Sequence, residues 1–179
     1  TVATGIVMPN ATGAALAPYP KMAGSASALM GFVQMALAAA AVANGGTIAE
    51  PHVGREIRDD DGAVISRIRP GDWTTAMPAQ TAAEITSMMI EVVQRGTGTA
   101  AALPDVTVAG KTGTAQFWRE SEGKKIKDNH TWFICFAPYE DPKFAITVFV
   151  QGAKSGGGVS APIVQRILEE SLALEKGFE

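Results

Sequence analysis

Cysteine and histidine are nearly absent from this sequence of 179 residues, which contains one Cys and two His. An internal disulfide needs two thiols, and protein zinc sites need several thiolate and imidazole ligands close together. The sequence therefore excludes a disulfide framework, and we expect neither a metal nor any other cofactor. The one thiol, Cys135, lies in the apolar run TWFICFAP, which predicts a buried and unreactive side chain. His52 and His130 show no partner pattern, and we interpret both as ordinary surface or strand-end histidines.

Charge is also sparse, because 18% of the residues are charged, the formal net charge is −3, and no long basic run occurs. A nucleic-acid partner is therefore not expected. Apolar residues make up 46% of the chain, which is enough for a packed core. The longest apolar stretch, ALMGFVQMALAAAAVANGG, carries Gln34 near its middle and predicts a buried helix rather than a membrane span. The opening TVATGIVMPN lacks a basic leader region, and we expect further residues upstream.

The pattern along the chain predicts helices mixed with an antiparallel meander. The expected elements are a connector at 1–24, a buried helix at 29–43, a hairpin at 51–70 turning at DDDG, a helix at 79–94, a meander across 106–151, and a closing helix at 161–176. The predicted strands are Val106–Trp118, Thr131–Ala137 and Phe144–Gln151, and the charged stretch RESEGKKIKDN separates the first two. Ser160 is the predicted N-cap of the closing helix.

The stretch VAGKTGTAQF at residues 108–117 combines a lysine, two threonines and two glycines in an apolar, β-favouring run. A phosphate-binding loop would require G-x-x-x-x-G-K-[ST] followed by a helix. The position of its first glycine is occupied by Asp105, which would repel phosphate, and the following TAQFW favours a strand. The sequence therefore argues against a phosphate loop.

An extended strand accounts for every residue of this motif. Side chains alternate along a strand, so Lys111 and Gly113 should face one way and Thr112 and Thr114 the other. A glycine in a strand permits close approach of another element or of a ligand. The free N–H groups of an edge strand can bind an extended peptide or stabilise the oxyanion of an acyl-transfer reaction.

Several separated stretches occur together with KTGTAQ. They are TGIVMP, QMALAAAAVANGGTIAEPHV, HTWFICFAPYEDPKFAITVFVQ and GGGVSAPIVQRILEESL. In this order they resemble the C-terminal half of the transpeptidase domain of class B penicillin-binding proteins. The resemblance implies an α+β sandwich fold like that of the β-lactamases, with helices on both faces of an antiparallel sheet, only partly present here.

The resemblance also implies roles for the motif residues. In such enzymes a serine of S-x-x-K attacks the substrate, assisted by S-x-N and by the K-T-G strand. Lys111 would then govern electrostatics and proton traffic at the serine, and the N–H of Thr114 would form half of the oxyanion hole. Thr112 and Thr114 would bind the terminal carboxylate of a D-Ala-D-Ala stem peptide or of a penicillin. The complete predicted substrate-binding set is Thr112, Gly113, Thr114, Gln116 and Trp118.

The nucleophile is missing from the motifs of this chain. No S-x-N occurs, and the only S-x-x-K is Ser121-Glu-Gly-Lys124, which follows the K-T-G strand in a charged turn. A nucleophilic serine needs a desolvated lysine beside it, and a charged turn does not provide one. We therefore interpret Ser121 as a loop residue, and expect the nucleophile and S-x-N to lie outside these residues.

The sequence predicts residues 1–179 to be the C-terminal portion of one peptidoglycan D,D-transpeptidase domain. Its expected ligands are stem peptides and β-lactams, and its expected location is the extracytoplasmic face of the bacterial cytoplasmic membrane, anchored upstream. A β-lactamase or penicillin sensor, and a non-catalytic peptide-binding module, remain alternatives. The expected partners are the rest of the domain or a second chain, together with cell-wall synthesis proteins. Exposed apolar side chains are therefore expected on the helix at 29–43 and the strand at 144–151.

Overall fold

The computed structural model describes residues 23–52, 54–69 and 71–176. The connector predicted at residues 1–24 lies outside this part except for its last two residues, which belong to a helix. The α-helices of this part of the chain are α2 (Ala23–Ala43), α3 (Ala79–Arg95) and α4 (Ala161–Lys176). Within the described residues, no helix is both long enough and apolar enough to span a bilayer.

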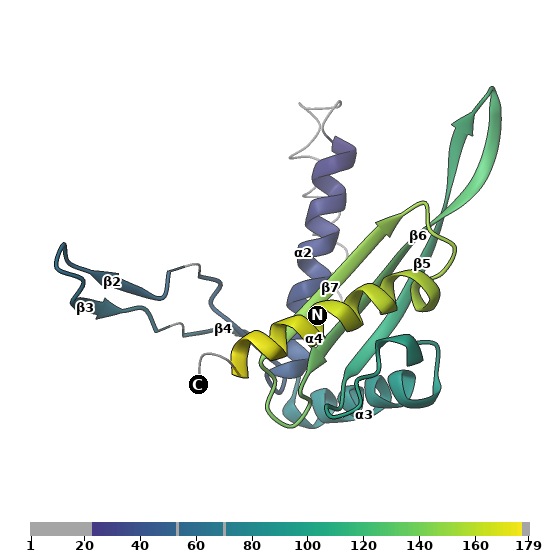
Figure 1. The fold of residues 1–179 in the computed structure, drawn as a ribbon. Helices are drawn as coiled ribbons and strands as arrows, with labels where there is room; N and C mark the ends of the chain where they lie inside the picture. The colour runs from purple at the N-terminus through teal and green to yellow at the C-terminus, as the bar shows by residue number, and fades with distance from the viewer. Residues whose placement is uncertain (1–22, 53, 70, 177–179) are drawn as a thin grey trace.

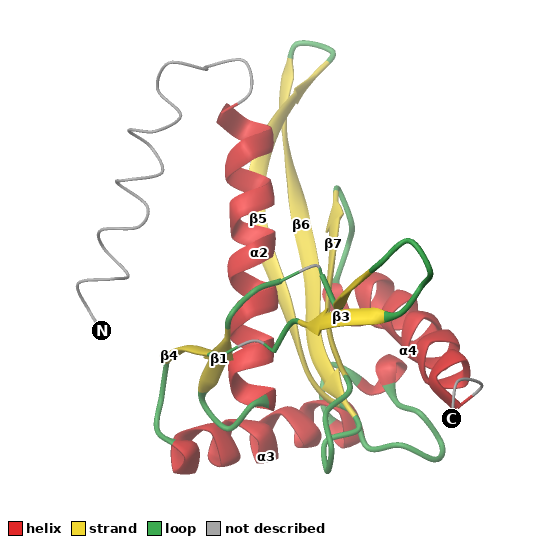
Figure 2. Ribbon diagram, turned by 90° about the vertical axis from the view of Figure 1, so that its left-hand side faces the viewer, coloured by secondary structure: helices red, strands yellow, loops and turns green. Residues whose placement is uncertain are grey.

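A three-stranded antiparallel sheet forms the centre of the described structure. Its strands are β5 (Ala109–Ser121), β6 (Lys124–Ala137) and β7 (Phe144–Gln151), in the order β5-β6-β7. Helices α2 and α4 lie on opposite faces of the sheet, and α3 crosses its end (Figure 1, Figure 2). The predicted α+β fold with helices on both faces is therefore confirmed.

Alternation along β6 divides the core between the two faces of the sheet. Phe133 and Cys135 face α4, where they pack with Val164 and Leu168. Phe136 faces the other way and packs in a second cluster with Val42 of α2, Met89 of α3 and Ala109 of β5. Helix α3 also contributes Val93 to the first cluster, so it joins both layers.

The closing helix has the predicted bounds, but its predicted cap is wrong. Ser160 ends a π-helical turn, η2 (Gly156–Ser160), that runs directly into α4. Its hydroxyl is fully buried and lies 3.1 Å from that of Thr131 on β6. The capping contact comes five residues earlier, where Ser155 Oγ accepts from the backbone N–H of Gly158 at 3.1 Å. The wider π-helical turn places the start of the helical path at Gly156, so Ser160 lies inside it and not at its N-cap.

Helix α2 begins six residues before its predicted start and is less buried than predicted. The alanines between residues 23 and 28 favour a helix, and no proline interrupts them. At its C-terminal end Ala39, Ala41 and Val42 are buried, whereas Met30, Phe32 and Val33 are exposed. The helix extends beyond the part of the sheet that covers it (Figure 1), which explains the difference.

Four short strands between residues 47 and 75 form a second, thin β structure that projects from the body of the molecule (Figure 1). The predicted hairpin is confirmed: β2 (Glu56–Arg58) pairs with β3 (Val64–Arg67). Asp59 Oδ1 accepts from the N–H groups of Asp61 and Ala63, which closes the turn. The sequence did not predict the pairing of β1 (Thr47–Ala49) with β4 (Asp72–Thr75) at the base of this arm.

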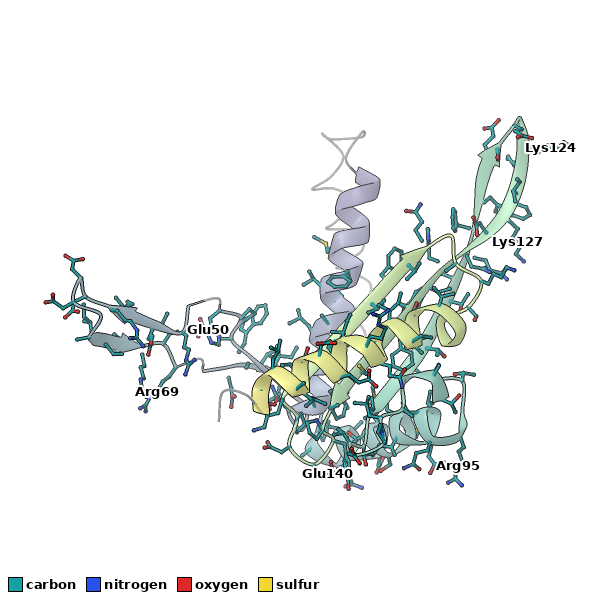
Figure 3. All side chains as sticks on the ribbon, in the orientation of Figure 1. Glu50, Arg69, Arg95, Lys124, Lys127 and Glu140 are labelled. Carbon is teal, nitrogen blue, oxygen red and sulfur yellow. The ribbon has the colours of Figure 1, made fainter. Side chains whose placement is uncertain are left out.

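The charged stretch between the first two predicted strands is not a separate loop. It continues β5 and β6 into a long hairpin that ends in the two-residue turn Glu122-Gly123. Both turn residues have positive φ, 53° and 71°, as the tightest hairpin turns require. The first strand also begins at Ala109 instead of Val106. Figure 3 shows Lys124 and Lys127 on the projecting end of this hairpin.

Candidate active site

The Lys-Thr-Gly-Thr motif lies on an edge strand, as predicted. Residues 109–121 pair with β6 without interruption, and within the described residues no strand pairs with the other edge of β5. Lys111 stands opposite Ile134, and Thr112 stands opposite Phe133, so the two side chains leave opposite faces of the sheet. The chain continues as a strand beyond the motif, which excludes the helix that a phosphate loop requires.

Thr112 and Thr114 open onto a shallow hollow of about 440 Å³ at the α4 side of the strand. We call this cavity the threonine hollow. Its lining residues are Thr112 and Thr114 of β5, Gly96, Thr97 and Thr99 after α3, and Ser155, Gly156, Gly157 and Gly158 before α4. Threonine and serine hydroxyls and glycine backbone are therefore available at this surface to a small polar or anionic group.

The lysine of the motif reaches back to the strand that carries it. Lys111 Nζ donates to the backbone carbonyl of Thr112 at 2.7 Å and lies 3.5 Å from Thr112 Oγ1. Although its Cβ belongs to the other face, its ammonium group therefore lies beside the threonine hydroxyl. The structure brings a cation and two hydroxyls together at one edge of the sheet.

Gly113 is a glycine for a packing reason. A Cβ at this position would overlap the indole ring of Trp132, which crosses the strand from β6. On the other side, a Cβ on Gly156 would lie 2.9 Å from the carbonyl oxygen of Gly113. The motif strand is therefore held between an indole ring and a glycine turn, and the predicted close approach is observed.

The remaining predicted substrate residues lie farther along the strand. Gln116 and Trp118 share the face of Thr112 and Thr114 but lie outside the threonine hollow. Trp118 is 66% exposed and lies near the tip of the projecting hairpin. The structure brings Thr112 and Thr114 together with Lys111, and leaves Gln116 and Trp118 on an open surface beyond them.

Two parts of the site were not predicted from the sequence. The turn after α3 supplies Thr97, whose Oγ1 lies 2.7 Å from Thr112 Oγ1. The glycine turn before α4 packs against the motif strand and, through Gly157, against the Thr97 carbonyl. The glycines of the two segments, at 96 and 98 and at 156–158, are the only signal in the sequence, and glycine by itself predicts a turn and not a site.

Ser121, the two histidines and the cysteine lie away from the threonine hollow, in settings that do not suggest a catalytic role. Ser121 stands opposite Lys124 at the hairpin tip, where the lysine is exposed. His130 stacks on Phe117 with ring centroids 3.9 Å apart, and His52 is exposed and contacts the Glu50 carbonyl. Cys135 is fully buried, and burial raises the pKa of its thiol to about 12, so the predicted inert thiol is confirmed.

Comparison with known proteins identifies the family. The model of the penicillin binding protein transpeptidase domain matches residues 4–169. This chain belongs to that family. Stage V sporulation protein D of Bacillus subtilis is 35% identical over 146 residues, which cover 78% of this chain and 22% of that protein. Peptidoglycan D,D-transpeptidase PbpA of Mycolicibacterium smegmatis is 32% identical, with 78% of this chain and 29% of that protein covered.

A solved structure supports the same assignment. Penicillin-binding protein A from M. tuberculosis, determined as an imipenem acyl-enzyme complex, aligns with a TM-score of 0.61 and 34% identity. The alignment covers 76% of this chain and 29% of that chain. The family predicted from the K-T-G strand is therefore confirmed. The chain spans less than a third of the length of these relatives.

Proposed function

We propose that this chain forms the substrate-strand side of a peptidoglycan D,D-transpeptidase that acts through a serine acyl-enzyme. The observation that carries the proposal is the exposed edge strand on which Thr112, Thr114 and the Lys111 ammonium converge. The names of the relatives agree with this activity, because one is a peptidoglycan D,D-transpeptidase and another was captured as an imipenem acyl-enzyme.

Each residue of the strand has a separate proposed task. Thr112 and Thr114 donate hydroxyl hydrogen bonds to the terminal carboxylate of the stem peptide or of a β-lactam. The N–H of Thr114 stabilises the oxyanion that forms when the serine attacks the carbonyl carbon. The Lys111 cation favours negative charge at the same edge of the sheet and assists proton transfer at the serine. Gly113, Gln116 and Trp118 complete the substrate surface along the strand.

The attacking serine and its S-x-N partner are proposed to come from outside residues 1–179. Neither S-x-N nor a buried S-x-x-K occurs in the sequence, and the chain covers only a fraction of each relative. The complete enzyme would work on the extracytoplasmic face of the bacterial cytoplasmic membrane, where its polymer substrate lies, held there by an upstream anchor and working beside other cell-wall synthesis proteins.

The test is acylation of the full-length protein by a labelled penicillin, followed by mass spectrometry. We expect a stable adduct on a serine outside this chain, and no adduct when residues 1–179 are expressed alone. Thr112→Val and Thr114→Val should each weaken acylation, because loss of one hydrogen bond to a charged group costs about 1–3 kcal/mol. An adduct on Ser121 would contradict the proposal, and rapid turnover of the adduct would favour a β-lactamase instead. Absence of any adduct on the full-length protein would favour a non-catalytic peptide-binding module.

A further inference from the structure

Thr97 is the one residue outside β5 whose side chain bonds to a threonine of the motif in the described part of the chain. It lies in the turn after α3, fifteen positions before Thr112, and the two Oγ1 atoms are 2.7 Å apart. The same distance would suit either direction of donation, because each hydroxyl can donate one proton and accept others. The direction in use decides what Thr112 can offer to a ligand.

The hydroxyl of Thr112 has a single proton to donate. Lys111 Nζ, 3.5 Å from Thr112 Oγ1, has only protons to give and so approaches the oxygen as a donor. If Thr112 donated to Thr97, no proton would remain for an anion in the threonine hollow. If Thr97 donates to Thr112, the Thr112 proton is free to point at that anion. A bound carboxylate therefore selects the second arrangement.

The turn that carries Thr97 is fixed in position from two sides. A Cβ on Gly98 would lie 3.0 Å from Phe133 Cε2, in the core beneath the sheet, and Gly98 is buried. A Cβ on Gly157 would overlap the Thr97 carbonyl oxygen. Since both neighbours pack this closely, the Thr97 hydroxyl is presented to Thr112 by rigid backbone, although its side chain is exposed to solvent.

We propose that Thr97 is a positioning residue for anion recognition, donating its proton to Thr112 so that Thr112 donates to the substrate carboxylate. The inference rests on the proposed function, because it assigns the carboxylate to Thr112. It adds a residue that the K-T-G motif does not contain. Thr97 touches no reacting atom in this scheme and acts only by orienting the hydroxyl of its neighbour.

The experiment measures penicillin acylation of the full-length protein, with the dissociation constant K of the initial complex separated from the acylation rate constant k2. Thr97→Val keeps the branched shape but removes the hydroxyl, and should raise K roughly three- to tenfold, the worth of one neutral hydrogen bond. The k2 value should change by less than about twofold, because the carboxylate is bound alike before and during the reaction. Thr97→Ser keeps a hydroxyl and should restore K.

A double-mutant cycle tests whether Thr97 works through Thr112. Thr97→Val combined with Thr112→Val should be no weaker than Thr112→Val alone, since the oriented hydroxyl is already gone. Thr147→Val serves as the matched control. Its hydroxyl is buried on β7 without a partner among the described residues, and its loss should leave K unchanged.

The outcomes separate this inference from the function on which it rests. An unchanged K in Thr97→Val, failure of Thr97→Ser to restore K, or multiplication of the two effects in the double variant would overturn the positioning role alone. A lower melting temperature with equal losses in K and k2 would reduce Thr97 to a structural residue and overturn it as well. If the unmodified full-length protein is not acylated, the proposed function itself fails, and the inference fails with it.

Discussion

Gly113 is the residue at which packing and the proposed chemistry meet. The Trp132 indole occupies the space where its side chain would be, and Gly156 packs against its backbone from the opposite side. A rigid ring and a backbone turn can yield less than the end of a flexible side chain. The glycine therefore lets β5 pass between the ring and the turn beside Lys111, Thr112 and Thr114, the residues proposed to bind the substrate.

Gly113→Ala should destabilise the protein by about 1–3 kcal/mol, because an added methyl group in a packed site forces neighbouring groups to move. Thermal unfolding followed by circular dichroism measures the change. Gly31→Ala is the matched control: apart from its own helix backbone and chain neighbours, no atom lies within 4 Å of the added Cβ, and Gly31 lies inside α2. That control should gain up to about 1 kcal/mol from helix propensity. Equal melting temperatures for the two variants would show that Trp132 does not confine Gly113.

At the scale of elements, the β5–β6 hairpin combines a packed base with an exposed end. Near the base, Ala109 and Phe136 belong to the core, whereas Trp118 and Ile126 near the tip are exposed. Figure 3 shows the side chains of the tip pointing away from the body of the molecule. The stability of the sheet should therefore depend on the base, with little contribution from the tip.

Replacing residues 120–125 by Asn-Gly should shorten the hairpin without unfolding the sheet. Arg119 pairs with Ile126, two pairs before the present closing pair Ser121–Lys124 and therefore of the same hydrogen-bonding type, so an Asn-Gly turn can join them in the existing register. We expect a melting temperature within a few degrees of the parent, since exposed loop ends tolerate deletion. Loss of the cooperative transition in circular dichroism would mean that the tip is required for folding.

Local signals predicted the helices well and the hairpin poorly. Pro78 and Gly96 flank α3, and the predicted bounds of the final helix agree with the observed ones. Both helices could be predicted because proline, glycine and amphipathic spacing are signals within a short stretch of sequence. The charged residues after Trp118 concealed strands, because a hairpin exposed on both faces needs no alternation of apolar and polar residues. The bond between Thr97 and Thr112 could not be predicted, since it depends on how a turn after one helix packs beside a distant strand.

At the scale of the whole molecule, the described structure exposes apolar side chains in several regions. The predicted exposure is observed on α2, at Met30, Phe32 and Val33, and on β7 at Phe149. Elsewhere on these two elements Val42 is buried, whereas Leu37, Ile146 and Val148 are half-buried. The projecting arm was not expected to contribute, but Ile57, Ile65 and Trp73 on it are exposed as well.

Purified as residues 1–179, the chain should therefore self-associate. Light scattering coupled to size-exclusion chromatography should give a mass above 18.6 kDa that rises with protein concentration. Phe32→Lys with Val33→Glu should reduce the association, because the two changes add charge to the exposed part of α2. Ile57→Lys with Ile65→Glu makes the equivalent change on the arm and shows which surface dominates. A mass of one chain at all concentrations would contradict the prediction.

The unbroken pairing of β5 with β6 restricts where an insertion or deletion of one residue can be tolerated in this hairpin. Every residue from Ala109 to Ser121 has a partner in one constant register, whereas the two small sheets of the arm contain register shifts. If one codon were inserted between Gly110 and Lys111 while the residues up to Gly110 kept their partners on β6, every later residue of the strand would move along by one position. Each of their side chains would then point to the opposite face of the sheet. The threonines would then face α2 and the lysine would face α4. Changes in length should accordingly accumulate at Glu122-Gly123, where an extra residue alters the turn and leaves the orientation of the motif intact.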